Sequence, residues 1–563
     1  MANLIVNKGA PSAENMKKFR VIRYPTQVGD IAKNKKKGGN RLQKKLEQIE
    51  KQSEQAYSSA EISGCMDSDM QYISDLFKKC SDFIIRRLEL GEGKTPCFAV
   101  YLGSLIKKES VNEYFLKPLM ADLRITGADS RFQGEIRIPE LAAASIYSYQ
   151  TQEFHLFKDV VNKLLIGYCA LFIDGSNTAL VADLKSEVGR AVSESRVETV
   201  VKGPHEAFVE DMRTNASLVR KRIKSPDLKL EMLEVGRLSS TSVVISYISG
   251  IVDEKIVDEV RTRISRIDVD IIQDSSYIEK YIEDSAFSPF PLMVLTERPD
   301  KCSAALAEGR VVVIIDGSPN ALILPVTFAD FLVAAEDYYY IFYFSTLLRI
   351  LRYLAFGISL LGPSFYIAMT TFHQEMIPLS LLVTFTRSRA EIPFPAIIEA
   401  LLMEFTFELL REAGIRLPQP VGSAVSIVGG LVIGQGVVQA GIVSQTMVIV
   451  VALTGIASFA IPTYNSAITF RLLRFPFMLM AAVFGIYGII MGLLVMLIHL
   501  ASLRSFGVPY LAPFTSSSFS DLKDSAIMAP IWTMTKRPSF IQKNNPHRMK
   551  KDIRPESRKT GGG

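Results

Sequence analysis

The 563-residue chain is poor in the residues that build most metal centres and hydrolytic sites. It has only five cysteines and five histidines, and no two cysteines stand in a CxxC spacing. The odd number and scattered positions of the cysteines argue against a disulfide framework or a zinc site. The isolated histidines give neither a Ser-His-Asp order nor a metal-ligand spacing. We therefore expect no enzyme, no metal and no cofactor.

The N-terminus lacks an apolar signal stretch, so we expect no cleaved secretion peptide. Positive charge is instead concentrated at the two ends of the chain. Residues 1–51 carry thirteen Lys or Arg against four acidic residues, and residues 535–563 carry nine against two. We interpret 1–56 and 506–563 as basic tails, the first of them disordered. They either contact anionic membrane lipid or only keep the chain soluble, and we expect no nucleic acid partner.

Long apolar runs dominate residues 339–505 and predict an all-α, multi-pass transmembrane domain. The segment from Val421 to Ile461 contains no charge and is long enough for two crossings. Four crossings would leave the C-terminal tail on the same side as the N-terminal domain, whereas five would put it on the other side. The expected spans are 340–361, about 421–440, about 442–461 and 475–500, with 364–385 as a fifth.

One short phrase occurs twice before the apolar runs. Residues 170–180 read ALFIDGSNTAL, and residues 311–322 read VVVIIDGSPNAL. An apolar run, an Asp-Gly turn and a second apolar run predict a strand–turn–strand unit. We interpret the repetition as two related α/β subdomains, at 57–200 and 201–338. Chance recurrence of a common hairpin would give the same phrase.

Charged residues interrupt the apolar segments, where a charge at mid-bilayer costs roughly 2.5–3.5 kcal/mol and so usually faces protein or water. Arg349 and Arg352 share one helical face, and Asp337 precedes them near the membrane entry. They form either an ion pair inside the oligomer or an interfacial group with snorkelling side chains. Glu375 and Pro378 suggest a broken or re-entrant segment, which lines a water-filled path or lies at the surface.

A segment near 393–413 is punctuated by glutamates and predicts an amphipathic helix, interfacial or between subunits rather than a span. Glu404, Glu408 and Glu412 follow an i, i+4, i+8 spacing and predict one acidic stripe. In a ring of subunits this stripe would attract cations. Alternatively, it is a solvated face that pairs with nearby arginines.

The uncharged segment 421–461 holds small side chains and few polar ones. Gln439, Val443, Thr446 and Val450 follow a 4-3-4 spacing and would share one face of a helix. We interpret these four residues as a pore-lining stripe, with ordinary helix packing as the alternative.

Several phrases occur together in an order that resembles the GerA family. They include VKGPHEAFVEDMRTNASLVRKRIK (201–224), FPLMVLTERPD (290–300) and RLLRFPFMLMAAVFG (471–485), and the resemblance spans about residues 75–515. Members of the family are A subunits of spore germinant receptors. The resemblance implies B and C subunit partners and a homo-oligomer, a pentamer, in the spore inner membrane. There it implies a nutrient-gated channel for monovalent cations that triggers germination.

Two other functions fit the same phrases. One is a non-conducting membrane scaffold that transmits the signal within the receptor, and the other is a channel paralogue like the sporulation-operon relative SpoVAF. A transporter is disfavoured, because residues 340–500 show no two matching halves.

The family phrases also mark a set of structural residues in the second subdomain. Arg298 is expected to pair with Glu206 or Glu210 and hold a turn. A ligand pocket between the subdomains and an interface with a neighbour are the alternatives. The matching residues are Gly203, Pro204, Glu206, Glu210, Asn215, Glu297, Arg298, Pro299 and Asp300.

Overall fold

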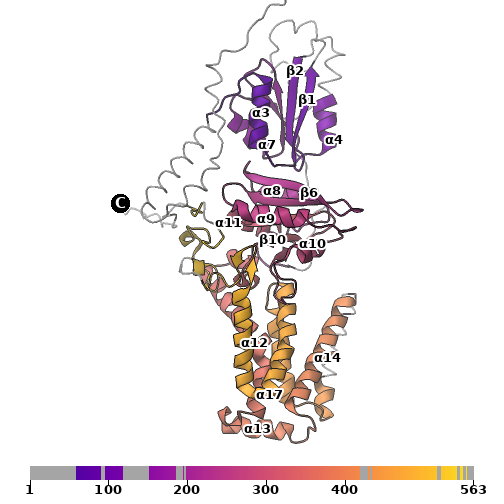
Figure 1. The fold of residues 1–563 in the computed structure, drawn as a ribbon, viewed down its shortest axis with the longest axis vertical. Coiled ribbons are helices and arrows are strands. Elements are labelled where there is room, and N and C mark those ends of the chain that lie inside the picture. Colours follow the sequence, from indigo (N-terminus) through magenta and orange to yellow (C-terminus); the bar gives the residue numbers. More distant parts are fainter. Residues whose placement is uncertain are drawn as a thin grey trace, which may run out of the picture. The chain divides into compact units, whose positions relative to one another are not determined.

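A computed structural model describes residues 59–90, 95–117, 151–185, 195, 198–418, 422, 429–430, 434–515, 521–541, 545–549 and 553. The expected N-terminal tail lies outside these residues. The chain divides into two compact units (Figure 1). Unit 1 comprises residues 1–187 and 223–229, and unit 2 comprises residues 188–222 and 230–563. Unit 2 therefore begins before the boundary expected at residue 200, and it joins an α/β part to the apolar helices.

Unit 1 is an α/β structure. Its elements are α3 (Met66–Leu76), β1 (Phe83–Leu90), β2 (Thr95–Leu102), α4 (Lys108–Val111), η1 (Asn112–Leu116), β3 (Thr151–Phe154), α7 (Phe157–Leu164), β4 (Tyr168–Ile173) and β5 (Ala179–Asp183). Its described strands form an antiparallel sheet in the order β1-β2-β4-β5-β3. All residues of β4 are buried, and Phe157 of α7 stacks on Phe172 of β4 in the core. The continuous apolar run of β4 is thus explained by helices that cover the sheet.

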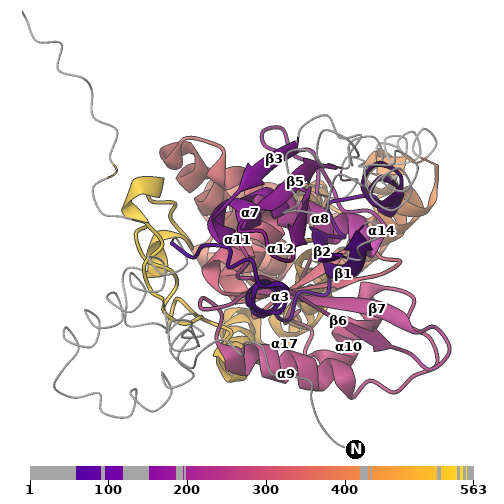
Figure 2. The same ribbon diagram turned by 90° about the horizontal axis from the view of Figure 1, so that it is seen from above.

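The α/β part of unit 2 has the same layout. Its elements are α8 (Met212–Arg222), β6 (Leu228–Val235), β7 (Thr241–Ile248), α9 (Glu254–Ser265), α10 (Ser275–Ile282), β8 (Val294–Thr296), α11 (Pro299–Glu308), β9 (Val311–Ile315) and β10 (Ala321–Leu324). Asp253 caps α9 by accepting a hydrogen bond from the backbone N–H of Lys255. The apolar face of α9, with Ile256 and Val260, packs on the sheet beside α10 (Figure 2).

The repeated phrase forms equivalent hairpins in the two sheets. The strand–turn–strand prediction is confirmed, because β4 pairs antiparallel with β5 and β9 pairs antiparallel with β10. Gly175 and Gly317 occupy the turns with φ of 83° and 81°, a backbone conformation that favours glycine. The described strands of the second sheet run β6-β7-β9-β10-β8, the same order as in unit 1. The shared order is the structural counterpart of the shared phrase.

The apolar helices follow two short turns, η4 (Phe328–Phe331) and η5 (Ala335–Tyr338). They are α12 (Phe342–Thr371), η6 (Gln374–Met376), α13 (Leu379–Arg389), α14 (Ala396–Arg416), α16 (Gln445–Phe459) and α17 (Tyr464–Ser502). Among the described residues, α12 and α17 are long and apolar enough to cross a membrane. The segment 364–385 is not a separate helix. It contains the end of α12, a break at η6 and most of α13. This agrees with the broken segment predicted from Glu375 and Pro378.

Helix α17 consists of two arms rather than one straight rod. Gly485 has φ 61° and ψ −139°, which is not helical. The ring of Phe290 lies 6.4 Å from the ring of Phe470 and 6.0 Å from that of His499. A straight helix would hold Phe470 and His499 roughly 40 Å apart, so the chain reverses at Gly485. The single span predicted at 475–500 is therefore wrong.

The arms of α17 define two ends of the helical region. Thr463, just before α17, donates a hydrogen bond to the carbonyl oxygen of Phe331 at 3.0 Å, so the first arm starts at the α/β part of unit 2. At the far end, a Cβ built on Gly485 would lie 2.8 Å from Cε1 of His373, which follows α12. Helix α12 and the first arm therefore run away from the α/β part, and the second arm returns to it (Figure 1).

Helix α14 runs the opposite way to the first arm of α17. Glu404 pairs with Arg474, and Glu408, one turn later on α14, pairs with Arg471, one turn earlier on α17. The helix therefore lies alongside the others. The sequence predicted an amphipathic helix near 393–413, interfacial or between subunits rather than a span, and α14 occupies this segment.

Residues after α17 fold back onto unit 2. They form β11 (Arg504–Ser505), β12 (Val508–Pro509), η7 (Asp521–Lys523) and η8 (Ile531–Thr533). The Ser505 hydroxyl donates to the carbonyl oxygen of Leu292 at 2.8 Å, and the Arg537 Nε donates to that of Ala307 at 2.8 Å. The described residues of the predicted basic tail at 506–563 therefore pack against the α/β part of unit 2. Together with Arg504 and Ser505 they form what we call the C-terminal segment (residues 504–515, 521–541 and 545–549).

Candidate functional site

A buried charge cluster lies where α12 begins. The Asp337 carboxylate accepts hydrogen bonds from Arg349 Nε at 3.1 Å and from Arg352 Nη1 at 2.7 and 2.8 Å. Asp337 and Arg349 have no exposed side-chain surface, and Arg352 is 11% exposed. The structure shows these arginines in a buried ion pair within one chain, whereas the ion pair was predicted inside an oligomer.

The C-terminal segment completes this entry cluster, which we define as Asp337, Arg349, Arg352 and Asp524. Arg349 Nη2 donates to Asp524 Oδ1 at 3.0 Å, and the Tyr338 hydroxyl donates to Asp524 Oδ2 at 2.9 Å. Burial raises the pKa of Asp524 above its usual value, while the nearby Arg349 opposes that rise. Two carboxylates thus face two guanidinium groups, which balances the charge of the cluster.

A second ion pair lies in the middle of the helical region. Glu404 of α14 and Arg474 of α17 pair with 4% and 3% of their side chains exposed. Arg474 Nε also donates to the carbonyl oxygen of Ser359, halfway along α12, at 2.8 Å. The pair therefore ties together three helices in surroundings that are otherwise apolar, where an unpaired charge would be costly.

The three glutamates of the predicted acidic stripe differ in how far they are buried. Glu404 is buried, whereas the side chains of Glu408 and Glu412 are 46% and 55% exposed. Glu408 pairs with Arg471 at 2.7 Å and with Arg411 at 3.3 Å. Glu412 pairs with Arg416 on its own helix at 2.6 Å. The alternative prediction of pairing with nearby arginines is the one realised, with α17 supplying partners that the spacing did not indicate.

A third buried carboxylate lies at the far end of the helical region. Glu399 of α14 is 1% exposed and accepts a hydrogen bond from the backbone N–H of Ser444 at 3.0 Å. Arg389 of α13 approaches it at 3.4 Å. Glu375, the other acidic residue predicted in this region, lies in η6 and is exposed.

The predicted stripe of Gln439, Val443, Thr446 and Val450 does not share one helical face. Helix α16 begins only at Gln445, and the preceding turn contains Gly441 with φ 64°. Val443 is 1% exposed. Gln439 is exposed, whereas Thr446 and Val450 are partly buried. The 4-3-4 spacing misled because it assumed an unbroken helix across this turn.

Arg298 organises the family motif residues, but its partners differ from those predicted. Its Nε and Nη2 atoms bind both oxygens of Asp300 at 3.0 and 2.7 Å. Nη2 also donates to the carbonyl oxygen of Pro204 at 3.1 Å. The predicted pairing with Glu206 or Glu210 is wrong, because Glu206 binds Arg222 at 2.7 Å. The predicted role of holding a turn is consistent with these contacts.

The other motif residues fix the backbone around this turn. A Cβ on Gly203, whose φ is 128°, would lie 2.8 Å from the ring of Tyr339. The Asn215 amide binds both the N–H and the carbonyl of Val209. The remaining contacts are Gly317 N–H to the Glu210 carbonyl at 2.8 Å, Ser195 hydroxyl to Glu297 at 2.6 Å and Pro299 in the first turn of α11.

The described residues contain no group of three His, Cys, Asp or Glu side chains that could hold a metal ion. What the geometry provides is a set of paired charges inside an apolar helical region. This region follows an α/β structure in the same unit, and together they define a modular protein with a folded α/β part and a set of apolar helices.

Comparison with known proteins assigns this architecture to a family. The family described as Bacillus/Clostridium GerA spore germination protein matches residues 71–540. The chain belongs to this family. Spore germination protein KA of Bacillus subtilis is 44% identical over 477 residues, which cover 84% of this chain and 86% of that protein. The uncharacterized membrane protein YfkQ of the same species is 40% identical, covering 86% of this chain and 93% of that protein.

One solved structure also matches. It is the crystal structure of the N-terminal domain of the A subunit of the Bacillus megaterium spore germinant receptor GerK3. It is 30% identical and covers 48% of this chain and 98% of that domain, with a TM-score of 0.38.

Proposed function

We propose that this chain is the A subunit of a nutrient germinant receptor. In this role it forms an oligomeric, nutrient-gated cation channel in the spore inner membrane, together with B and C subunits. Its membership of a family of spore germination proteins supports the germination role. The observation that carries the channel is the series of buried ion pairs through the helical region, because buried charge among apolar helices commonly marks an ion path or a gate.

The helical region has the surface of a membrane domain. Large apolar side chains point outward from it, such as Leu354, Val483 and Ile498, which are 63%, 62% and 68% exposed. Water would penalise this area by about 25 cal/mol per Å², whereas lipid would not. A related protein is also named as a membrane protein. These features support a multi-pass membrane domain.

The alternating directions of the helices support six passes. The described passes are α12, α14, α16 and the two arms of α17, and the span predicted at about 421–440 would be the sixth. An even number puts the C-terminal segment on the same side as the α/β part of unit 2. We assign that side to the cytoplasm, because Arg416, Arg504 and Arg537 lie there, against Arg387 and Arg389 on the far side.

In an oligomer, exposed polar side chains of the helical region would line the ion path. In a ring, proposed as a pentamer, copies of α14 would present Glu412 repeatedly around an axis and attract monovalent cations. Gln439 remains a candidate for the pore wall because it is exposed. Val443 is a poor place for a pore-blocking charge, because a buried lysine there would destabilise the fold.

The test is ionic current from this chain with its B and C partners, in a bilayer, with and without a panel of nutrients. The proposal expects a nutrient-dependent cation current whose selectivity changes with Glu412→Gln or Gln439→Lys. Glu109→Gln, an exposed change in unit 1, serves as the matched control. A complex that co-purifies intact but passes no current for any nutrient would favour a non-conducting scaffold. Current without nutrient or partners would favour a channel paralogue.

A further inference from the structure

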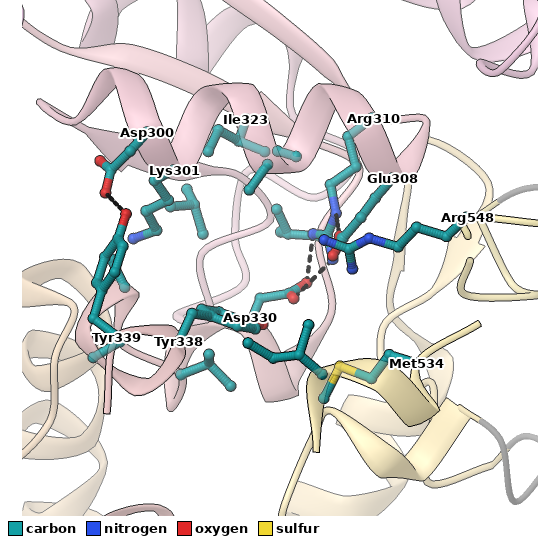
Figure 3. Close-up of a pocket in the computed structure, with 18 of the residues that line it drawn as sticks. Asp300, Lys301, Glu308, Arg310, Ile323, Asp330, Tyr338, Tyr339, Met534 and Arg548 are labelled. Atoms are coloured by element: carbon teal, nitrogen blue, oxygen red, sulfur yellow. Dashed lines mark hydrogen bonds and ion pairs between the residues drawn. The ribbon is translucent and has the colours of Figure 1, made fainter. Parts of the chain in front are cut away.

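A cavity of about 280 Å³ lies within unit 2, beside the turn η5 that precedes α12. Helix α11, the turn η5 and the C-terminal segment enclose it, as Figure 3 shows. Its size is near the lower limit of small-molecule sites, which span about 300–1,000 Å³. The cavity is therefore large enough for a small organic molecule.

Most of the cavity wall is apolar. Ala304 of α11 lies on one side, and Val333 lies before η5. Ile531 and Met534, from the C-terminal segment, form the opposite wall. That segment is fixed next to the cavity, because Arg537 Nε binds the Ala307 carbonyl and Arg537 Nη1 binds the Asn545 carbonyl at 3.0 Å. The wall is thus part of the fold.

Charged groups lie at both ends of the cavity: Asp300 and Lys301 at one end, and Glu308, Arg310 and Asp330 at the other (Figure 3). Arg310 binds both oxygens of Asp330 at 2.7 and 2.8 Å, and its Nε binds Glu308 at 3.2 Å. Asp300 is held by Arg298, and Lys301 pairs with Glu198 at 3.0 Å. These groups already have partners of opposite charge.

Arg548 is the exception among the described residues that line the cavity. Its side chain extends toward Glu308 and Arg310 in Figure 3. It attracts the Glu308 and Asp524 carboxylates at a distance, but no hydrogen bond or ion pair joins its guanidinium group to any described residue. The charge that the cavity leaves available to a ligand is therefore positive.

We propose that this cavity binds a small amphipathic carboxylate. Its apolar body lies against Ala304, Val333, Ile531 and Met534, and its carboxylate forms paired hydrogen bonds with Arg548. A guanidinium group is suited to this role, because its planar fork matches the two oxygens of a carboxylate. The site stands independently of ion conduction, since it requires only the fold of unit 2.

The position of the cavity links it to the apolar helices. Tyr338 lines the cavity and donates its hydroxyl hydrogen bond to Asp524 of the entry cluster. The bound carboxylate would hold the C-terminal segment against α11 and η5, and so would stabilise the cluster at the start of α12. Binding should therefore slow amide hydrogen exchange in residues 531–541.

Binding can be measured by calorimetry on the full purified chain in detergent micelles. The probe is 4-methylpentanoate, and 4-methylpentan-1-ol and 4-methylpentylamine are controls with the same apolar body. We expect saturable carboxylate binding in the millimolar range or tighter, with the alcohol and amine at least about tenfold weaker. An amine that binds as well as the carboxylate, or a folded chain that does not bind the carboxylate, would overturn the proposal.

Variants locate the binding within the cavity. Arg548→Gln should weaken carboxylate binding about tenfold, and Ala304→Phe should abolish it by filling the space. Ala304 is exposed to the cavity, so this change leaves the core intact. Arg266→Gln, an exposed change at the end of α9, is the matched control and should have no effect. Unchanged binding by Arg548→Gln contradicts the proposal even if Ala304→Phe fails to fold.

Discussion

Replacing Asp337 by Asn tests whether the entry cluster stabilises the protein. The change keeps the size of the side chain but removes one of the two negative charges that face Arg349 and Arg352. Asp337 has no exposed side-chain surface, so water cannot replace the lost charge. Removing one partner of a buried ion pair typically costs about 3–5 kcal/mol. We expect a loss of this size in the free energy of unfolding of unit 2.

The loss can be measured as a shift in the thermal unfolding midpoint of the purified chain in detergent. A cost of this size should lower the midpoint by an amount on the order of 5 °C. Asp268→Asn is the matched control, because Asp268 makes an equally close pair with Arg237 in which both side chains are mostly exposed. Solvent screens that pair, so the control should change the midpoint little.

Two outcomes would refute this reasoning. Equal shifts for Asp337→Asn and Asp268→Asn would mean that burial does not strengthen the entry cluster. The second outcome concerns Arg352, which pairs with Asp337 alone among the described acidic residues. Adding Arg352→Met to Asp337→Asn restores the charge balance and should recover more than half of the loss. No recovery would mean that charge is not the cause.

Three further changes test other parts of the structure. Gly203→Ala should lower the free energy of unfolding by about 2 kcal/mol, because φ is positive at this residue and the new Cβ would clash with the Tyr339 ring. Thermal unfolding should show a larger loss for Gly203→Ala than for Gly250→Ala, whose new Cβ would have no atom within 4 Å. Glu404→Gln should lower the free energy of unfolding by about 3 kcal/mol, because it breaks the buried ion pair with Arg474. An unchanged thermal unfolding midpoint would contradict this pairing. Burial would raise the pKa of Asp300, but its hydrogen bonds outweigh burial and lower it below 3.8. The ionised Asp300 carboxylate therefore stabilises the fold fully above that pH, and this stabilisation is lost as the pH falls further. The difference in thermal unfolding midpoint between the unchanged protein and Asp300→Asn should accordingly narrow below about pH 4. A midpoint difference that does not depend on pH would contradict this role of Asp300.

Local patterns predicted the α/β parts well. The Asp-Gly turns and their flanking apolar runs specify the β4–β5 and β9–β10 hairpins within a few residues. The spacing of Ile256, Val260 and Ile264 is that of an amphipathic helix, and these residues form the buried face of α9. Such features depend on contacts between neighbours in sequence, which periodicity and turn chemistry record directly.

The partners of the buried charges could not be predicted in the same way. Asp524 lies 175 residues after Arg349, and Arg474 lies 70 residues after Glu404. Only the tertiary fold brings such residues together, so spacing carries no signal of it. The family phrase likewise led us to predict Glu206 or Glu210 as the partner of Arg298, whereas the structure pairs it with Asp300, two residues away.

The sequence contained signals against two of the wrong predictions, the single pore-lining face and the single span at 475–500. Gly441 and the capping residue Ser444 mark a turn and a helix start within the segment predicted as one pore-lining face. Gly485 is the first of three glycines in a long apolar run, where a glycine indicates a possible break in regular structure. Length and hydropathy alone treat such a run as a single helix, and a helical hairpin has the same composition.

The entry cluster is assembled from parts that are synthesised at different times. Arg349, Arg352 and Asp337 emerge together from the ribosome, whereas Asp524 follows 175 residues after Arg349. The incomplete chain therefore carries one excess positive charge at the start of α12 while its apolar segments are still being made. In the proposed membrane domain, that charge would help to retain the start of α12 on its own side during insertion. The last part of the chain would then neutralise it, so the same residues would first guide the orientation of the nascent chain and afterwards secure the finished fold.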